Sequence, residues 1–146
     1  MKRLHETTEE FIGLLQQVEK TRQVEPLVAL FAEDAALLSP VLSQPLRGKE
    51  GARNFWRKHL ALFRRVRSEM TEVLENSLDS GDNRRLLVVL EWQADAVLAT
   101  GKPLSFQGIS LVELVQGQVQ SFRTYYDSLP LLRASLQRQD AYQQAG

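Results

Sequence analysis

Cysteine is absent from the 146-residue sequence, and histidine occurs only as His5 and His59. The lack of thiols excludes disulfides, thiol catalysis and thiolate metal sites. Two imidazoles alone are a poor basis for a metal centre, so we expect neither a metal nor a cofactor. An excess charge of one sign is also missing, because 18 basic side chains balance 18 acidic ones. We therefore expect no nucleic-acid partner.

Long apolar runs are missing as well. No stretch of about 18 apolar residues occurs, and no apolar segment follows the initial Met-Lys-Arg. The sequence therefore predicts a cytoplasmic protein that has no membrane partner. Its length fits one domain over residues 1–146, without a linker or repeat, and residues 137–146 form a polar tail that we expect to fray.

The most regular pattern that is present lies in residues 106–127, FQGISLVELVQGQVQSFRTYYD. Alternating apolar and polar residues on both sides of Gln116-Gly117 predict a β-hairpin. The pair at the turn fits either a two-residue turn or a three-residue turn with a glycine bulge, and a slip of one residue would exchange the two faces of the hairpin.

The rest of the chain shows helices first and strands afterwards, which is typical of an α+β fold. Apolar spacing and capping signals predict helices over residues 8–20, about 26–32 and 49–63, and from about residue 130, where Asp127 or Ser128 is the expected cap. Period-2 and turn signals predict strands over residues 35–38, 66–78 and 86–98.

Three segments, FAEDAALLSP, PLRGKEGARNFW and GQVQSFRTYYD, resemble the SnoaL-like branch of the nuclear transport factor 2 superfamily in their order and spacing. The resemblance covers almost the whole chain. It implies a curved, largely antiparallel sheet wrapped around a long helix, a cone with a deep pocket. It also implies a homodimer formed through the outer face of the sheet.

The strand over residues 86–98 fits two orientations, because its even positions are all apolar and its odd positions include Glu91, Gln93 and Asp95. From the sequence alone, the apolar face fits the core. The family geometry instead points Glu91 and Gln93 into the cone. The dimer surface would then consist of Leu90, Trp92, Ile109, Leu111 and Tyr125.

The family register favours the glycine bulge in the hairpin. The residues expected on its inner face are Phe106, Gly108, Ser110, Phe122, Thr124 and Tyr126, and those expected outside are Ile109, Leu111, Arg123 and Tyr125.

The resemblance also indicates which chemistry to exclude. Ketosteroid isomerases carry a carboxylate base at the position of Ser39 and oxyanion donors at the positions of Leu15 and Ser110. Limonene-epoxide-hydrolase-like members carry an arginine between two acids, where this chain has Glu91, Gln93 and Thr124. Neither activity is expected.

Glu91 and His59 remain as the expected catalytic proton carriers. The alternative is that Glu91 is satisfied by a neighbouring polar group and that His59 packs at the edge of the core beside Trp56. The expected substrate-binding residues are Ser39, Trp56, Gln93, Phe106, Ser110, Phe122, Thr124 and Tyr126. Such a wall suits a small, mainly apolar ligand that is bound or converted without redox chemistry. The alternative function is a dimeric scaffold whose cone is filled by side chains.

Overall fold

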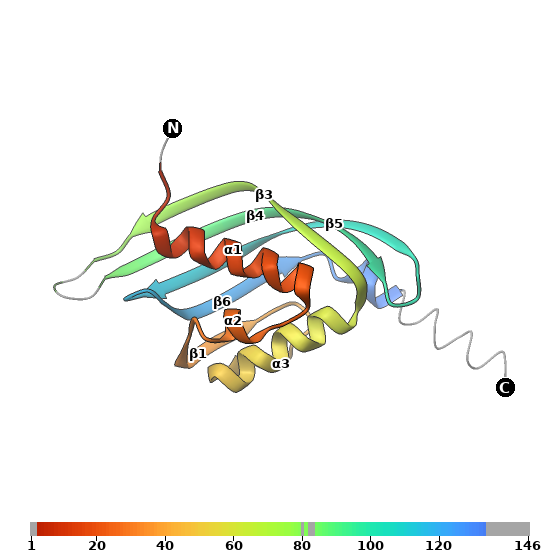
Figure 1. Cartoon of the computed structure of the whole chain (residues 1–146), viewed down its shortest axis with the longest axis horizontal. Coiled ribbons are helices and arrows are strands. Elements are labelled where there is room, and N and C mark those ends of the chain that lie inside the picture. Colours follow the sequence, from red (N-terminus) through yellow and green to blue (C-terminus); the bar gives the residue numbers. More distant parts are fainter. Residues whose placement is uncertain (1–2, 80, 82–83, 134–146) are drawn as a thin grey trace.

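The computed structural model describes residues 3–79, 81 and 84–133. It contains helices α1 (Glu6–Thr21), α2 (Glu25–Val28) and α3 (Gly48–Ala61), and strands β1 (Phe31–Leu38), β2 (Leu46–Arg47), β3 (Phe63–Ser77), β4 (Arg85–Leu98), β5 (Pro103–Val115) and β6 (Gln118–Tyr126). The strands form one sheet in the order β2-β1-β6-β5-β4-β3, in which β1 runs parallel to β6 and the other pairs are antiparallel. The sheet curves over α1 and α3, which lie on its concave side (Figure 1). The predicted α+β cone is confirmed.

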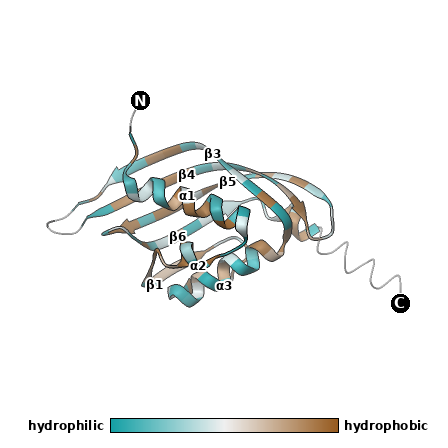
Figure 2. Cartoon of the chain, viewed as in Figure 1, coloured by the Kyte–Doolittle hydropathy of each residue, from teal (hydrophilic) through white to brown (hydrophobic). Residues whose placement is uncertain are grey.

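The two long helices each bury one apolar stripe against the sheet. Helix α1 buries Phe11, Leu15 and Val18, and α3 buries Phe55 and Trp56. Hydrophobic and hydrophilic residues lie side by side along the helices and strands (Figure 2). This is the pattern of amphipathic elements arranged around a shared core.

Several boundaries differ from the prediction, and two of these differences bear on the ends of helices. Phe31, which was expected in the second helix, begins β1 and pairs with Val119 of β6. The main-chain N–H of Val119 also donates to the carbonyl oxygen of Leu30. These sheet contacts bury Phe31 completely, which explains why α2 ends early. Phe63 begins β3 instead of ending α3.

The orientation taken from the family for residues 86–98 is wrong. Leu90 is fully buried and Trp92 is 9% exposed, whereas Glu91 and Gln93 face solvent. Burying the apolar even positions of β4 removes far more hydrocarbon from water than burying its odd positions would. Leu90 and Trp92 are therefore excluded from any surface on the outside of the sheet.

The hairpin has the predicted faces but a different turn. Gln116 and Gly117 form a two-residue turn, and both have positive φ angles, 50° and 82°, as a type I′ turn requires. The register shifts at Gln120 in β6, between the pairs Leu114–Val119 and Glu113–Ser121. This bulge replaces the one expected at the turn and brings Phe122, Thr124 and Tyr126 to the inner face.

The described chain ends in a short helical segment, residues 129–133. Asp127 accepts a hydrogen bond from the N–H of Leu129, 3.0 Å away, as in an Asx turn, and the carbonyl oxygen of Ser128 accepts from the N–H of Leu132, so of the two expected caps Ser128 holds the cap position. The predicted polar tail, residues 137–146, lies outside the described residues. Among the described residues, no helix has the length and apolar character needed to cross a membrane.

Candidate functional site

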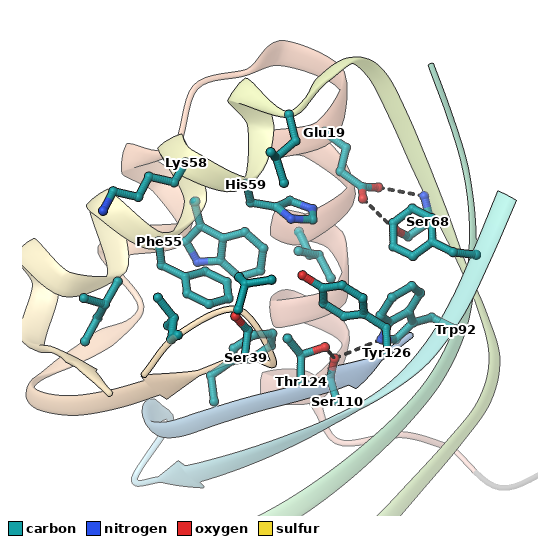
Figure 3. Close-up of a pocket in the computed structure, with 18 of the residues that line it drawn as sticks. Glu19, Ser39, Phe55, Lys58, His59, Ser68, Trp92, Ser110, Thr124 and Tyr126 are labelled. Carbon is teal, nitrogen blue, oxygen red and sulfur yellow. Dashed lines mark hydrogen bonds between the residues drawn. The ribbon is translucent and has the colours of Figure 1, made fainter. Parts of the chain in front are cut away.

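A cavity of about 290 Å³ lies inside the cone, between α1, α3 and the concave face of the sheet. Figure 3 shows that its side chains converge from helices and strands that are distant in sequence. The lining is mainly apolar, with polar groups in several places. The lining residues are Leu15, Glu19, Ser39, Val41, Leu42, Leu46, Phe55, Trp56, Lys58, His59, Leu62, Ser68, Met70, Trp92, Phe106, Ser110, Phe122, Thr124 and Tyr126.

The first polar group is a hydrogen-bonded chain on the sheet. The indole Nε1 of Trp92 donates to Ser110 Oγ, 3.0 Å away, and Ser110 Oγ lies 2.9 Å from Thr124 Oγ1 (Figure 3). Ser110 and Thr124 are directly paired across β5 and β6. Ser110 is 4% exposed and Thr124 is 7% exposed, so these hydrogen-bonded side chains are almost completely shielded from bulk solvent.

The second polar group is His59 of α3, which is packed between aromatic rings. Its ring makes edge contacts with Trp56 at 5.9 Å and with Phe63 at 5.2 Å between centroids. Burial lowers the pKa of His59 to about 4, because the charged imidazolium is poorly solvated there. Within the described part of the chain, no hydrogen bond is formed by the imidazole, so His59 is a neutral group available to a ligand.

The third polar group was not predicted. Glu19 of α1 accepts hydrogen bonds from the N–H and the hydroxyl of Ser68 in β3, at 2.9 and 2.6 Å. Desolvation raises the pKa of Glu19, although the two bonds from Ser68 oppose the shift. Figure 3 shows the His59 ring pointing toward the Glu19 carboxyl. The signal in the sequence was its spacing: Glu19 follows Leu15 by four residues and so shares the apolar stripe of α1.

Two further hydroxyls face the cavity. Tyr126 points its phenol oxygen into the space between His59 and the sheet (Figure 3), and burial raises its pKa. Ser39 is 6% exposed and lies at the end of β1, on the opposite wall. In the described chain neither hydroxyl has a protein partner, so both remain free to bind a ligand.

The cavity brings together most of the predicted site residues. Those that line it are Ser39, Trp56, His59, Phe106, Ser110, Phe122, Thr124 and Tyr126. Glu91 and Gln93 do not, because they occupy the outer face of β4. Thr71 donates to the side chain of Glu91 there, at 3.2 Å. The inward placement of Glu91, on which its predicted catalytic role rested, is therefore wrong.

No group of three or more His, Asp or Glu side chains in the described segments is placed to hold a metal ion. The polar groups of the cavity are instead hydroxyls, the indole N–H groups of Trp56 and Trp92, one imidazole, one carboxyl and the ammonium of Lys58. They suit hydrogen bonding and proton transfer.

Comparison with known families gave one match that spans most of the chain. The sequence model of the SnoaL-like domain matches residues 13–122. A search of curated proteins found no match.

Solved structures resemble the whole cone at low sequence identity. An NTF2-like protein of unknown function from Burkholderia pseudomallei is 14% identical with a TM-score of 0.69, covering 88% of this chain and 97% of that one. A protein with a ketosteroid isomerase-like fold from Catenulispora acidiphila, in complex with trimethylamine, is 17% identical with a TM-score of 0.64, covering 80% of this chain and 85% of that one. A hexachlorocyclohexane dehydrochlorinase (LinA) type 2 is 12% identical with a TM-score of 0.70, covering 83% of both chains. These likenesses establish the fold.

Proposed function

The chain belongs to the SnoaL-like domain family, and from this premise we propose that it binds a small, mainly apolar molecule inside the cone. The observation that carries the proposal is the cavity of about 290 Å³ with aromatic walls and a few convergent polar groups. That volume lies near the lower end of known ligand sites, roughly 300–1,000 Å³. A cone filled by side chains, as the scaffold alternative requires, would not leave this space. Trimethylamine in a structural neighbour supports the same use of the fold.

The two tryptophans of the chain provide the direct test. Trp56 and Trp92 both line the cavity, so fluorescence excited selectively in tryptophan reports on its walls. We expect apolar molecules of one or two rings to change the emission and to raise the melting temperature in a dose-dependent way. Native mass spectrometry of the purified protein would show the mass of any retained ligand.

A pair of variants separates cavity binding from surface binding. Leu42→Trp enlarges a lining side chain, whereas Leu78→Trp makes the same change at an exposed position outside the cavity. We expect only Leu42→Trp to abolish the ligand-induced rise in melting temperature. Equal binding by both variants would contradict the proposal.

We propose further that, if the ligand is converted, Glu19 and His59 move the proton. Burial raises the pKa of Glu19 and lowers the pKa of His59 to about 4, and pKa values displaced in this way are common among groups that transfer protons in enzymes. Glu19 thus takes the role expected of Glu91. No redox step is needed. With Ser39 in place of a carboxylate base we expect no turnover of ketosteroids, and with Glu91, Gln93 and Thr124 in place of an arginine between two acids we expect none of limonene epoxide.

Glu19→Gln and His59→Gln test this role. A catalytic pair predicts that each variant keeps ligand binding and loses turnover. A purely structural role predicts the reverse for Glu19, because its bonds to Ser68 join α1 to β3. In that case the melting temperature would fall while turnover per folded molecule stayed constant.

We also propose a homodimer through the outer face of the sheet, corrected for the orientation of β4. Leu74, Ile109 and Tyr125 are 55%, 43% and 46% exposed there, and Leu111 lies between them on β5. Exposed apolar side chains on one face are a usual feature of subunit interfaces. Light scattering should give twice the mass of one chain, and Tyr125→Asp should reduce it. A monomer at all concentrations would contradict the dimer.

A further inference from the structure

The cavity floor carries a donor that the protein itself does not use. We call the cavity floor the three side chains Trp92 on β4, Ser110 on β5 and Thr124 on β6, which are joined by contacts of 3.0 and 2.9 Å. Both hydroxyl-bearing side chains line the cavity and are more than nine-tenths buried. A buried polar hydrogen without an acceptor is costly, so its partner has to come from the cavity.

The count of hydrogens follows from side-chain chemistry. The indole N–H of Trp92 can only donate, so Ser110 Oγ is its acceptor. The contact between Ser110 and Thr124 uses one hydroxyl hydrogen, whichever of them donates. The other hydroxyl hydrogen has no acceptor among the described residues. In both arrangements the floor presents one spare donor.

The charges around the cavity decide which acceptor fits. The charged side chains of the described lining, Glu19 and Lys58, come from α1 and α3, away from the strands that form the floor (Figure 3). A carboxylate on the floor would lose its hydration without gaining a counter-charge, which is strongly unfavourable. A neutral oxygen has a much smaller cost and can replace a water on the spare donor.

Resting on the proposed function, we propose that the ligand carries a neutral carbonyl-type oxygen, such as that of a ketone, ester or amide, which accepts the spare hydrogen of the Ser110–Thr124 pair. The remainder of the ligand is apolar and packs against the aromatic walls, which include Phe106 and Phe122. The floor thereby orients a molecule that the apolar walls alone would hold in many orientations.

Tetralin and 1-tetralone form a suitable probe pair, because they differ by one carbonyl oxygen. We would measure both dissociation constants by calorimetry on the wild-type protein and on the double variant Ser110→Ala/Thr124→Val. For each protein we take the ratio of the dissociation constant of tetralin to that of 1-tetralone, which is the preference for 1-tetralone. Comparing this ratio between the two proteins cancels the different hydration of the two compounds. We expect the preference for 1-tetralone to fall about fivefold in the double variant, the effect of one hydrogen bond.

The single variant Thr124→Val tests the hydrogen count itself. It leaves the hydroxyl of Ser110 without its neighbour, so one spare donor remains and the preference should stay within about twofold of wild type. Thr71→Val, the same substitution on the exposed face of β3, serves as the matched control. A preference that is unchanged in the double variant would overturn the inference.

Infrared spectroscopy of bound 1-tetralone gives a readout that does not need a folded double variant. A hydrogen bond lowers the carbonyl stretching frequency relative to an apolar solvent. A band at the apolar-solvent position in the wild-type complex would overturn the inference even if binding is tight. Tighter binding of tetralin-1-carboxylate than of 1-tetralone would overturn the choice of a neutral acceptor. If neither tetralin nor 1-tetralone binds, the proposed function fails and this inference fails with it.

Discussion

Gly108 is the position where one added methyl group should do most damage to the cavity. It lies in β5 between Trp92 of β4 and Tyr126 of β6. A Cβ atom at Gly108 would lie 2.5 Å from Trp92 Cζ2, 2.9 Å from Trp92 Cη2 and 2.5 Å from the carbonyl oxygen of Tyr125. The indole can tilt, but the carbonyl belongs to the hydrogen-bonded sheet and cannot move alone.

The cost of Gly108→Ala has two parts. Overpacking of a filled site costs about 1–3 kcal/mol. Tilting Trp92 also removes its hydrogen bond to Ser110, which contributes about 1 kcal/mol. The sum is about 2–4 kcal/mol, and since 1 kcal/mol corresponds to roughly 2–4 °C in a chain of this size, we expect the melting temperature to fall by about 4–16 °C.

Gly13→Ala provides the matched control. Gly13 lies within α1, and a Cβ atom there would meet nothing within 4 Å. Because alanine favours the helix, we expect a gain of about 0.5–1 kcal/mol from the same chemical change. Calorimetry and urea denaturation of both variants measure the difference. If Gly108→Ala melts within 2 °C of wild type, the close approach at this site is not as described.

Three further predictions follow from polar contacts outside the cavity floor. Arg22, which ends α1 with a φ of 63°, donates hydrogen bonds to three main-chain carbonyls at the junction of α3 and β3. A lysine cannot reproduce the forked donors of the guanidinium, so Arg22→Lys should lower the free energy of unfolding, measured by urea denaturation, by about 1–2 kcal/mol. Desolvation alone would raise the pKa of Glu75, but hydrogen bonds from Thr8 and His5 outweigh it and lower the pKa. The stability that Glu75 contributes is therefore present above its unfolded pKa and lost as the pH falls below it, so the difference between wild type and Glu75→Gln should shrink on acidification. His59 has a pKa of about 4 in the folded protein and about 6.5 in the unfolded chain, so it does not reduce the stability of the protein above pH 6.5 but reduces it progressively as the pH falls toward 4. In His59→Gln this acid-dependent loss in the free energy of unfolding, up to roughly 3 kcal/mol, should disappear.

The amphipathic elements could be predicted from the sequence because their own pattern determines them. The apolar stripe of α1 and the alternation along β4 both gave the correct element. The alternation of β4 was compatible with the observed orientation, in which the apolar even positions are buried, but it left the opposite orientation open. The error at Glu91 and Gln93 came from giving the family geometry priority over this burial pattern. Hydrophobic burial decides the face of a strand, and one step of register reverses it.

Contacts between elements were harder to predict. The inner face of the hairpin was predicted correctly although its turn was not, because a bulge at Gln120 shifts the register as much as a bulge at the turn would have. Glu19 was missed for a related reason. Its place on the stripe of α1 is visible in the sequence, but its partner Ser68 lies 49 residues away on β3, and no local pattern links the two.

The cavity itself has a simple origin in side-chain size. Along the concave face, the paired positions Ser110 and Thr124 at the middle of β5 and β6 hold small side chains, and Gly108, which pairs with Tyr126, holds none. Large residues there would fill the cone, because the aromatic side chains of Trp56 and Phe122 already meet at 5.3 Å between ring centroids. Ser110 and Thr124 also make the floor polar, and Gly108 leaves room for the close approach of the Trp92 ring. Size and polarity are therefore linked: replacing Thr124 by a large apolar residue would remove the space and the hydrogen-bonding floor together. A filled, stable cone without ligand binding is the expected result, so selection for stability alone would not favour an open, polar floor.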